Sequence, residues 1–245
     1  MHLAPQPFDS SIFGGPVFRL TAPTQAAEPL EAAIADAVRQ DARLVMARVA
    51  ATEGETIQAL ERAGFAPVEK LITLEVPIDG HGEFPPRIHL GGPDRADSCA
   101  QIARAAFTFD RFHTDRRIDP EVAAKMKEAW VLNGFAGRAE TCLVAIGGND
   151  ETTGFLLTLR HQDAVIIDLV AVAPDCQGQG IGRDLIAATK AHAAAAGATT
   201  IRVGTQAANQ ASLRLYFAAG FKPVTESATL HFIPEARQYR RGVPS

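Results

Sequence analysis

Apolar and polar positions along this chain of 245 residues recur with two different periods. Short runs dense in apolar and β-branched residues predict strands at 15–20, 43–50, 68–76, 88–90, 142–146, 154–160, 164–172, 200–204, 221–224 and 228–233. Longer segments, in which apolar residues return every three or four positions, predict helices at 28–40, 53–63, 93–107, 120–135, 180–195 and 209–219. A hairpin turn is expected at 161–163. Strands that alternate with helices predict an α/β fold, in the form of an α+β mixed sheet.

A turn-rich stretch at 77–86 divides these elements into two groups. We therefore predict an N-terminal α/β domain at 1–78, a linker at 79–87 and a larger domain at 88–245. The two parts share a sequence echo, because Ala63-Gly64-Phe65 and Ala219-Gly220-Phe221 each follow a predicted helix and begin similar runs. Two interpretations stay open. The N-terminal domain is a partial copy of the larger one, or the same helix–glycine–strand turn arose twice.

The composition is that of an ordinary globular protein, with 47% hydrophobic and 21% charged residues. A net charge of -4 argues against a general nucleic-acid-binding protein, which would carry a basic surface. The start of the chain lacks a signal-peptide pattern, and no apolar run reaches membrane-spanning length. We therefore expect a cytoplasmic protein with neither nucleic acid nor membrane as a partner. Cys99, Cys142 and Cys176 are odd in number and widely spaced, which predicts neither a disulfide framework nor a metal site.

The segment after the predicted strand 164–172 combines a glycine-rich turn with the start of a helix. The turn consists of Gln177, Gly178, Gln179, Gly180, Ile181 and Gly182. Backbone N–H groups at a helix start lack partners within the helix, and glycine lets a phosphate approach them closely. The turn has neither the Lys-Ser/Thr pair of a P-loop nor a dinucleotide fingerprint. It is expected to bind phosphate, and the alternative is a tight turn that needs glycine only for its backbone. Cys176, just before it, is expected to fill space rather than to react.

Two polar residues stand seven positions apart on the helix predicted at 209–219. Asn209 opens this helix, and asparagine is a favoured N-cap. Tyr216 follows two turns later on the same face. In one interpretation Asn209 only caps the helix and Tyr216 only packs its ring. In the other, the hydroxyl of Tyr216 acts as a general acid.

The order strand, Gln-x-x-Gly-x-Gly turn, helix, followed by Asn209 and Tyr216, resembles the GNAT acyltransferase superfamily. The resemblance implies a GNAT acyltransferase fold preceded by a smaller α/β domain, with acetyl-CoA as cosubstrate and no metal. It also implies cofactor contacts through the turn, through Asn209 and through the backbone of the preceding strand. The strand residues concerned are Leu169, Val170, Ala171 and Val172.

Charged side chains outside this motif are candidates for contact with an amine acceptor. Glu69 follows the first Gly-Phe segment, where its carboxylate is either a proton acceptor or an ordinary surface group. The segment 111–117 combines three arginines with one histidine and one phenylalanine. Its residues Arg111 and His113 suit a loop that binds a nucleotide diphosphate, or a solvated turn with internal ion pairs.

Four parts of the chain together resemble the dTDP-fucosamine acetyltransferases of bacterial surface-polysaccharide synthesis. These parts are 8–14, 63–69, 111–115 with Trp130, and 202–216. The resemblance implies transfer of acetyl to the 4-amino group of a dTDP-linked amino sugar, with Tyr216 as the general acid and Glu69 as a candidate base. The chain departs from that family at Leu215, where the family has arginine, although Arg214 stands one position earlier.

Three functions follow from these features. The first is an N-acetyltransferase that moves acetyl from acetyl-CoA to the amine of a nucleotide-linked amino sugar by direct attack. The second is a GNAT enzyme that acts on a small free amine, an amino acid or a peptide terminus. The third is a non-catalytic acyl-CoA-binding module, against which the retained Tyr216 speaks. A homodimer is compatible with each of them.

Overall fold

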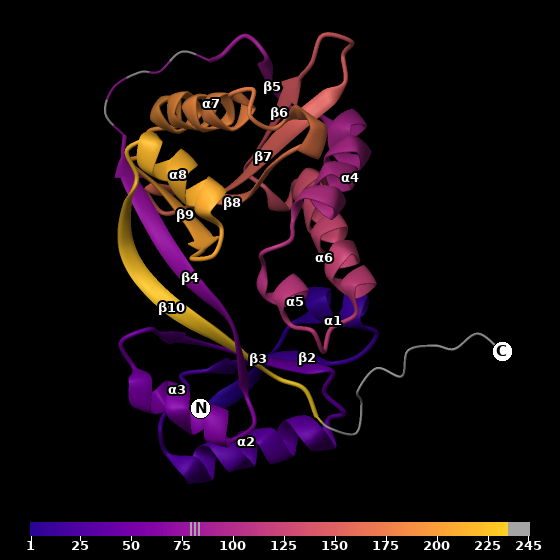
Figure 1. Ribbon diagram of the computed structural model, residues 1–245, viewed down its shortest axis with the longest axis vertical. Helices are drawn as coiled ribbons and strands as arrows, with labels where there is room; N and C mark the ends of the chain where they lie inside the picture. The colour runs from indigo at the N-terminus through magenta and orange to yellow at the C-terminus, as the bar shows by residue number, and fades with distance from the viewer. Residues whose placement is uncertain (79, 81, 83, 235–245) are drawn as a thin grey trace, which may run out of the picture. The chain divides into compact units, whose positions relative to one another are not determined.

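The computed structural model describes residues 1–78, 80, 82 and 84–234, and the chain forms two compact units (Figure 1). Unit 1 contains Met1–Leu71, Phe109–Met126 and, in the described part of the C-terminal segment, residues 225–234. Unit 2 contains Ile72–Thr108 and Lys127–Val224. Both units are therefore discontinuous in sequence.

Unit 1 has its strands in the order β1-β2-β3-β10-β4. Their bounds are β1 His2–Pro5, β2 Val17–Thr21, β3 Leu44–Ala50, β4 Ala66–Pro77 and β10 Lys222–Phe232, and both β4 and β10 continue into unit 2. β2 and β3 run parallel, whereas β1 runs antiparallel to β2 and β10 runs antiparallel to β3. The helices are α1 Pro7–Phe13, α2 Ala27–Arg39, α3 Gly54–Arg62, α5 Arg111–Thr114 and the first part of α6 Pro120–Asn133.

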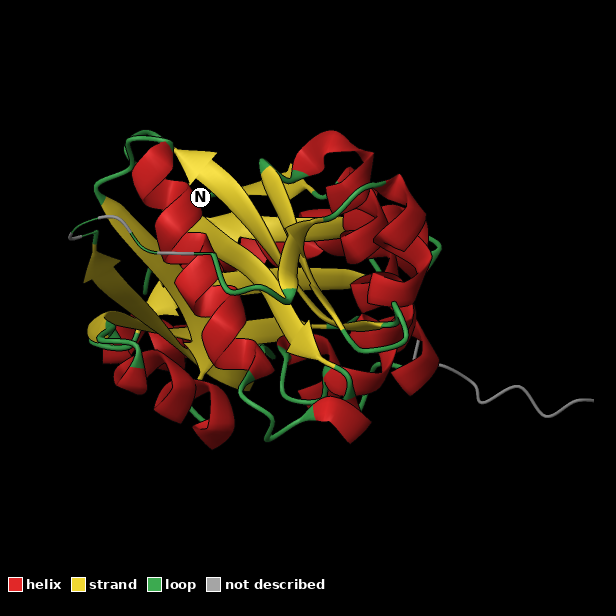
Figure 2. Ribbon diagram, turned by 90° about the horizontal axis from the view of Figure 1, so that it is seen from above, coloured by secondary structure: helices red, strands yellow, loops and turns green. Residues whose placement is uncertain are grey.

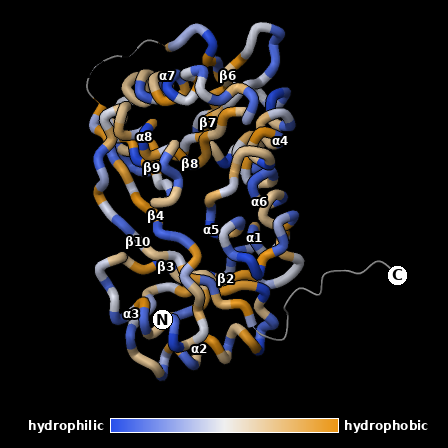
Figure 3. The backbone as a smooth tube through the Cα atoms, in the orientation of Figure 1, coloured by the Kyte–Doolittle hydropathy of each residue, from blue (hydrophilic) through white to orange (hydrophobic). Residues whose placement is uncertain are grey.

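The two faces of the unit 1 strands differ in chemistry, because side chains alternate along each strand. One face shares an apolar core with α2 and α3, and the hydropathy of β2 and β3 is visible in Figure 3. This core contains Phe18, Leu20, Leu30, Ala37, Ala42, Val45, Ala47, Val49, Leu60, Phe65 and Leu230. The other face carries Arg19, Met46, Arg48, Thr229 and His231, since the register pairs Arg19 with Met46, Arg48 with Thr229 and Met46 with His231.

Unit 2 has its strands in the order β4-β9-β8-β7-β6-β5. The further bounds are β5 Ile88–Leu90, β6 Thr141–Ile146, β7 Thr152–His161, β8 Ala164–Val172 and β9 Thr200–Gln206. β8 and β9 run parallel, and the pairs from β5 to β8 are antiparallel. The helices are α4 Ala96–Ala106, the rest of α6, α7 Ile181–Ala195 and α8 Gln210–Ala218, with a π-helical turn at Gly134–Arg138 and 3-10 turns at Pro93–Arg95 and Pro174–Cys176.

Helices cover both faces of the unit 2 strands, so neighbouring residues of one strand enter different cores. Leu156 of β7 packs in a core with Leu185 of α7, which lies across the strands (Figure 2). Phe155 and Leu157, on either side of it, share the opposite core with Ile102 of α4. Burial on both faces explains why β7 is an almost continuous apolar run in the sequence.

The predicted α/β fold with a mixed sheet is confirmed. The hairpin between β7 and β8 also forms, with Gln162 in the left-handed region at φ 57°. The N-terminal segment forms β1 and α1, neither of which was predicted, because α1 has only 7 residues and is bounded by Pro7 and Gly14 rather than by a long apolar period. The two strands predicted at 221–233 are one strand, β10, because backbone pairing continues through the polar residues near Glu226, whose carbonyl accepts from Ala51 N at 2.9 Å.

The sequence echo corresponds to a shared chain path. Gly64 and Gly220 end α3 and α8 with φ values of 91° and 87°, and a strand follows each of them. The series β2–α2–β3–α3–β4 and β8–α7–β9–α8–β10 have the same order, each with a parallel first pair of strands. The last strand of each series lies beside a strand of the other series. β10 pairs with β3 of the first series, and β4 neighbours β9 of the second. We propose on this basis that the N-terminal part is a partial copy of the C-terminal part.

The predicted domain boundaries are not those of the compact units, because unit 2 begins at Ile72 and unit 1 regains 109–126. Residues 79, 81 and 83 of the predicted linker lie outside the described residues. The boundaries at 78 and 88 stay a prediction about folding domains. None of the described helices combines the length and the apolar character needed to cross a membrane.

Candidate active site

The parallel strands β8 and β9 of unit 2 separate along their length. Their register pairs end at Ile167 and Val203, although both strands continue. The separation coincides with an irregularity in β8, where the pairing with β7 skips Asp168. A bulge bends a strand and increases its twist. Within the described chain, the backbone of 169–172 is therefore not paired with β9. An extended ligand can add to a strand edge of this kind through backbone hydrogen bonds.

The turn after β8 owes its shape to two glycines. Gly178 and Gly180 have φ values of 78° and 80°, which side chains with a Cβ rarely adopt. Gly180 is the N-cap of α7 and has no side chain to satisfy the first N–H groups of the helix. Gly182 has a different reason, because a Cβ there would lie 3.2 Å from Leu215 Cδ2 of α8. The turn therefore presents N–H donors that have no partner within the helix, together with the positive end of α7, which suits a phosphate.

Arg87 contacts both the turn and the helix that follows it. Its Nε donates to Asp184 Oδ2 at 2.6 Å, and its Nη2 donates to the carbonyl of Gln179 at 3.1 Å. The C=O and N–H of one trans peptide point in opposite directions, so the contact with Gln179 directs the N–H of Gly180 away from Arg87. The guanidinium also offsets the Asp184 carboxylate, which would repel a phosphate. Arg87 was predicted as the end of a linker, and no local pattern linked it to a partner 97 positions away.

Asn209 and Tyr216 occupy the predicted positions on α8. Asn209 is the N-cap, and its Oδ1 accepts from Ser212 N at 3.1 Å, which leaves its amide donors available. Tyr216 is 2% exposed and its ring lies 5.4 Å from that of Phe221. Burial raises the pKa of Tyr216 well above its ordinary value, so the phenol stays protonated at neutral pH. A protonated hydroxyl is the form that a proton donor needs.

Glu69 lies in unit 1, on the polar face of its strands. Its side chain is 2% exposed, and Oε1 accepts from Arg48 Nη2 at 2.9 Å and from Thr229 Oγ1 at 3.0 Å. Glu69 is therefore a buried, fixed carboxylate and not the ordinary surface group that the sequence allowed.

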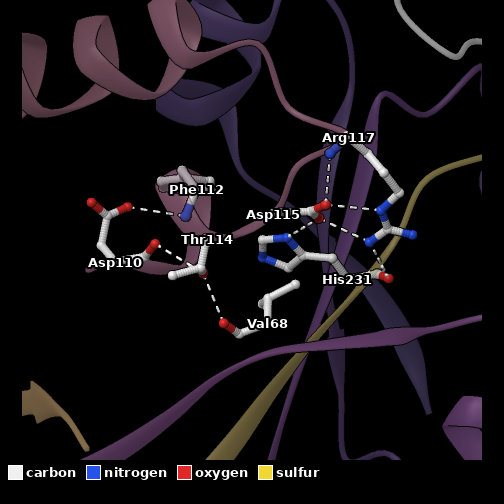
Figure 4. A network of polar contacts seen from close by, with 7 residues as sticks. All are labelled: Val68, Asp110, Phe112, Thr114, Asp115, Arg117 and His231. Atoms are coloured by element: carbon white, nitrogen blue, oxygen red, sulfur yellow. Dashed lines mark hydrogen bonds and ion pairs between the residues drawn. The ribbon is translucent and has the colours of Figure 1, made fainter. Parts of the chain in front are cut away.

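Arg111 and His113 lie on α5 of unit 1, in a segment that was expected to be a loop. Asp110 caps this helix, accepting from Phe112 N at 3.0 Å through one carboxylate oxygen and contacting His113 Nδ1 at 2.5 Å through the other. The guanidinium of Arg111 lies 4.4 Å above the ring of Phe112. Thr114 Oγ1 donates to the carbonyl of Val68 at 2.7 Å, beside Glu69 in the chain (Figure 4). Unit 1 thus holds all three residues predicted for the acceptor and its proton.

A buried network fastens this segment to β10 (Figure 4). Asp115 Oδ2 lies 3.0 Å from His231 Nδ1 and 2.8 Å from Arg117 Nη2, which also donates to the carbonyl of His231 at 3.1 Å. Burial would raise the pKa of Asp115, but hydrogen bonds from Arg117 and His231 outweigh it and lower that pKa. An ionised Asp115 only accepts, so Nδ1 of His231 carries the proton. Within the described chain the buried Nε2 of His231 has no hydrogen-bond partner.

His231 makes stability depend on pH. Burial lowers the pKa of His231 below its ordinary 6.5, more than Asp115 raises it. The unfolded chain therefore binds a proton below about pH 6.5 that the folded protein does not bind. The free energy of unfolding should fall with decreasing pH from that point, by up to about 1.4 kcal/mol per pH unit for one proton.

Urea unfolding between pH 5 and pH 7.5 measures this slope. In His231→Asn, which keeps a donor for Asp115 but does not titrate, the slope should decrease. The exposed His89, changed to Asn, is the matched control and should keep the wild-type slope. Equal slopes in wild type and His231→Asn would contradict the assignment.

The two groups of predicted residues fall in different units. Unit 2 contains every residue predicted for the cofactor, together with Tyr216. Unit 1 contains Glu69, Arg111 and His113. Sequence reasoning missed Arg87, Arg48 and His231, because their partners are distant in the chain and no motif indicates them. The Asp115–Arg117 pair is one of the internal ion pairs that the sequence allowed for the segment 111–117.

The cysteines are free thiols. Burial raises the pKa of Cys142 to about 11 and, with a smaller effect of Cys142, that of Cys99 to about 12. Burial and the neighbouring Asp175 raise the pKa of Cys176, which disfavours a reactive thiolate beside the turn. In residues 1–78, 80, 82 and 84–234, no group of three or more His, Cys, Asp or Glu side chains is arranged to hold a metal ion.

Comparison with known proteins identifies the family. The acetyltransferase (GNAT) family model matches residues 99–221, half of the chain. The chain is 33% identical over 156 residues to the spore coat polysaccharide biosynthesis protein SpsD of Bacillus subtilis, across 63% of this chain and 54% of that protein. It is 27% identical over 177 residues to dTDP-fucosamine acetyltransferase of Escherichia coli, across 72% of this chain and 75% of that protein. The matched region thus spans about half the length of SpsD.

Solved structures share the fold. A GCN5-related N-acetyltransferase from Sphaerobacter thermophilus matches with a TM-score of 0.57 and 19% identity, across 83% of this chain and 65% of that chain. The chain therefore belongs to the GNAT acetyltransferase family, as its turn and α8 predicted. Acetyltransferases of this family use acetyl-CoA as cosubstrate and an amine as acceptor. The separated strands and the turn of unit 2 fit that cosubstrate, since they offer a strand edge and the N–H groups at the start of α7.

Proposed function

We propose that this protein is an N-acetyltransferase that acts on the amino group of a nucleotide-linked amino sugar. The names of two relatives, a dTDP-fucosamine acetyltransferase and a spore coat polysaccharide biosynthesis protein, support a sugar acceptor. The observation that carries acetyl transfer is the turn at Gly178 and Gly180 beside separated strands, with the buried Tyr216 in the same unit. Arg111 and His113 support an acceptor with an anionic group, because a guanidinium forms paired hydrogen bonds with phosphate.

The proposed cofactor contacts are those predicted from the sequence. The pyrophosphate of acetyl-CoA binds the N–H groups of 177–182, and the pantetheine arm binds the backbone of 169–172. The side-chain amide of Asn209 is the remaining contact, with donors not used by the cap.

The chemistry follows from direct attack. The amine nitrogen of the acceptor attacks the thioester carbon, the C–S bond breaks, and the thiolate takes the proton of Tyr216. The amine loses one proton, for which Glu69 is the candidate acceptor, directly or through water. The products are an amide and CoA as the free thiol, with Tyr216 left as a phenolate and Glu69 protonated. Proton exchange with water returns both side chains to their starting forms, so atoms and charge balance over the full cycle.

An assay of thiol release from acetyl-CoA tests this function against dTDP- and UDP-linked amino sugars, free amino acids and polyamines. We expect the highest kcat/KM with a nucleotide-linked amino sugar. Arg111→Ala should raise the KM for that acceptor about tenfold, the loss of roughly one charged hydrogen bond, with acetyl-CoA affinity nearly unchanged. Equal activity with free amines, or equal weakening of both ligands by Arg111→Ala, would favour a small-amine acetyltransferase instead.

A further inference from the structure

Arg48 of unit 1 is held in one orientation although its side chain is only partly buried. Its Nε donates to Thr229 Oγ1 at 3.1 Å and its Nη2 donates to Glu69 Oε1 at 2.9 Å. Thr229 Oγ1 donates to the same Glu69 oxygen at 3.0 Å, so the three groups form a closed triangle. The side chain of Arg48 is 44% exposed, whereas that of Glu69 is 2% exposed. A buried carboxylate and a buried hydroxyl thus preorganise a partly exposed arginine side chain, which lowers the entropic cost of binding a ligand.

More positive charge lies close to Arg48. Arg19 is on the same face, since it pairs with Met46, two positions before Arg48 on β3. Burial, Arg111 and Arg19 lower the pKa of Arg48, and Glu69 opposes them. Arg48 thus has two further guanidiniums, those of Arg19 and Arg111, among its charged neighbours besides the Glu69 carboxylate. Like charges held together raise the free energy of the site, and a bound anion would lower it again.

We propose that Arg48, Arg19 and Arg111 form a site in unit 1 for the phosphate or diphosphate group of a ligand, in which Glu69 and Thr229 position Arg48. The planar guanidinium matches two phosphate oxygens, which a single ammonium group does not. The attribution of this anion to the acceptor rests on the proposed function, whereas the site itself does not. In this arrangement Glu69 has a positioning role in addition to its candidate role as a base.

Inorganic pyrophosphate is the probe for this site. Calorimetry titrates it into the full chain saturated with CoA, which occupies the turn of unit 2. We expect Arg48→Ala to weaken pyrophosphate binding at least tenfold, because a charged hydrogen bond is lost. Arg48→Lys keeps the charge but loses the planar guanidinium that makes paired hydrogen bonds, and it should weaken pyrophosphate binding less. The matched control is Arg39→Ala, an exposed arginine of α2 that pairs with Asp36, and it should bind pyrophosphate as the wild type does.

Several outcomes would overturn the proposal. Pyrophosphate that fails to bind the CoA-saturated wild type, or that binds wild type and Arg48→Ala equally, removes the site. If Arg39→Ala loses as much pyrophosphate affinity as Arg48→Ala, the binding reflects only the general positive charge of the surface and not a specific site. If Arg48→Ala weakens acetyl-CoA binding by the same factor as pyrophosphate binding, Arg48 contacts the phosphates of the cofactor and not a separate anion. Arg48-dependent pyrophosphate binding in a protein inactive toward every nucleotide-linked amino sugar would support the site and overturn the proposed function.

Discussion

Replacement of Tyr216 by phenylalanine is expected to lower kcat by about 10²- to 10⁴-fold, the usual contribution of general acid catalysis. The ring is 2% exposed and packs 5.4 Å from the ring of Phe221, a contact that phenylalanine keeps. Only the hydroxyl and its proton are lost, so the fold and acetyl-CoA affinity should remain close to those of the wild type.

The raised pKa of Tyr216 is compatible with a role as general acid when both the donor phenol and the acceptor CoA thiolate are considered. A buried phenol is a weak acid, but the same surroundings also destabilise a CoA thiolate, because both charged forms lose solvation. Proton transfer is then expected as the C–S bond breaks and not before. Single-turnover kinetics with saturating acetyl-CoA measure the chemical step directly.

Phe217→Leu is the matched control for Tyr216→Phe. Phe217 is the next residue of α8 and is 50% exposed, so its replacement should change kcat little. A Tyr216→Phe variant with wild-type kcat in single turnovers would show that Tyr216 is only a packed aromatic.

Replacement of Gly180 by aspartate is expected to weaken acetyl-CoA binding by about 10²-fold or more. Gly180 has φ 80° and is the N-cap of α7, and a Cβ there would lie 3.4 Å from Arg87 Nη2. An aspartate would place a negative charge where the phosphate is proposed to bind. At a separation near 4 Å two unit charges repel by up to about 4 kcal/mol close to a protein surface, where each 1.4 kcal/mol is tenfold in affinity.

Two further variants separate charge from backbone strain. Gly180→Asn has nearly the same shape as the aspartate and tolerates a positive φ, so it should lose about tenfold at most. Gly197→Asp puts the same residue at another glycine with positive φ (69°), beyond the end of α7, and should leave affinity unchanged. Calorimetry of acetyl-CoA binding compares the three. Unchanged acetyl-CoA affinity in a folded Gly180→Asp protein would show that the pyrophosphate does not bind at this turn.

The sequence predicted the elements of the fold wherever a local pattern defines them. α7 and α8 begin within one residue of the predicted positions, because a glycine N-cap at Gly180 and an asparagine N-cap at Asn209 mark their starts. β10 was divided wrongly because its polar centre breaks the apolar pattern, while the backbone pairing that holds it there depends on β3. α1 was missed because its 7 residues, bounded by Pro7 and Gly14, are too few to show a helical period of apolar residues.

The sequence by itself determined the parts of this protein that neighbouring residues specify. The glycine turn, the caps and the spacing of Asn209 and Tyr216 all act within a few turns of chain, so their residue types are visible in order. The tertiary structure alone decided the polar contacts between residues far apart in the chain. Arg87 meets Asp184 across 97 positions, His231 meets Asp115 across 116, and Arg48 meets Thr229 across 181. Such contacts depend on strand register and on which sheet face a residue joins, and a one-residue shift of register would exchange the faces.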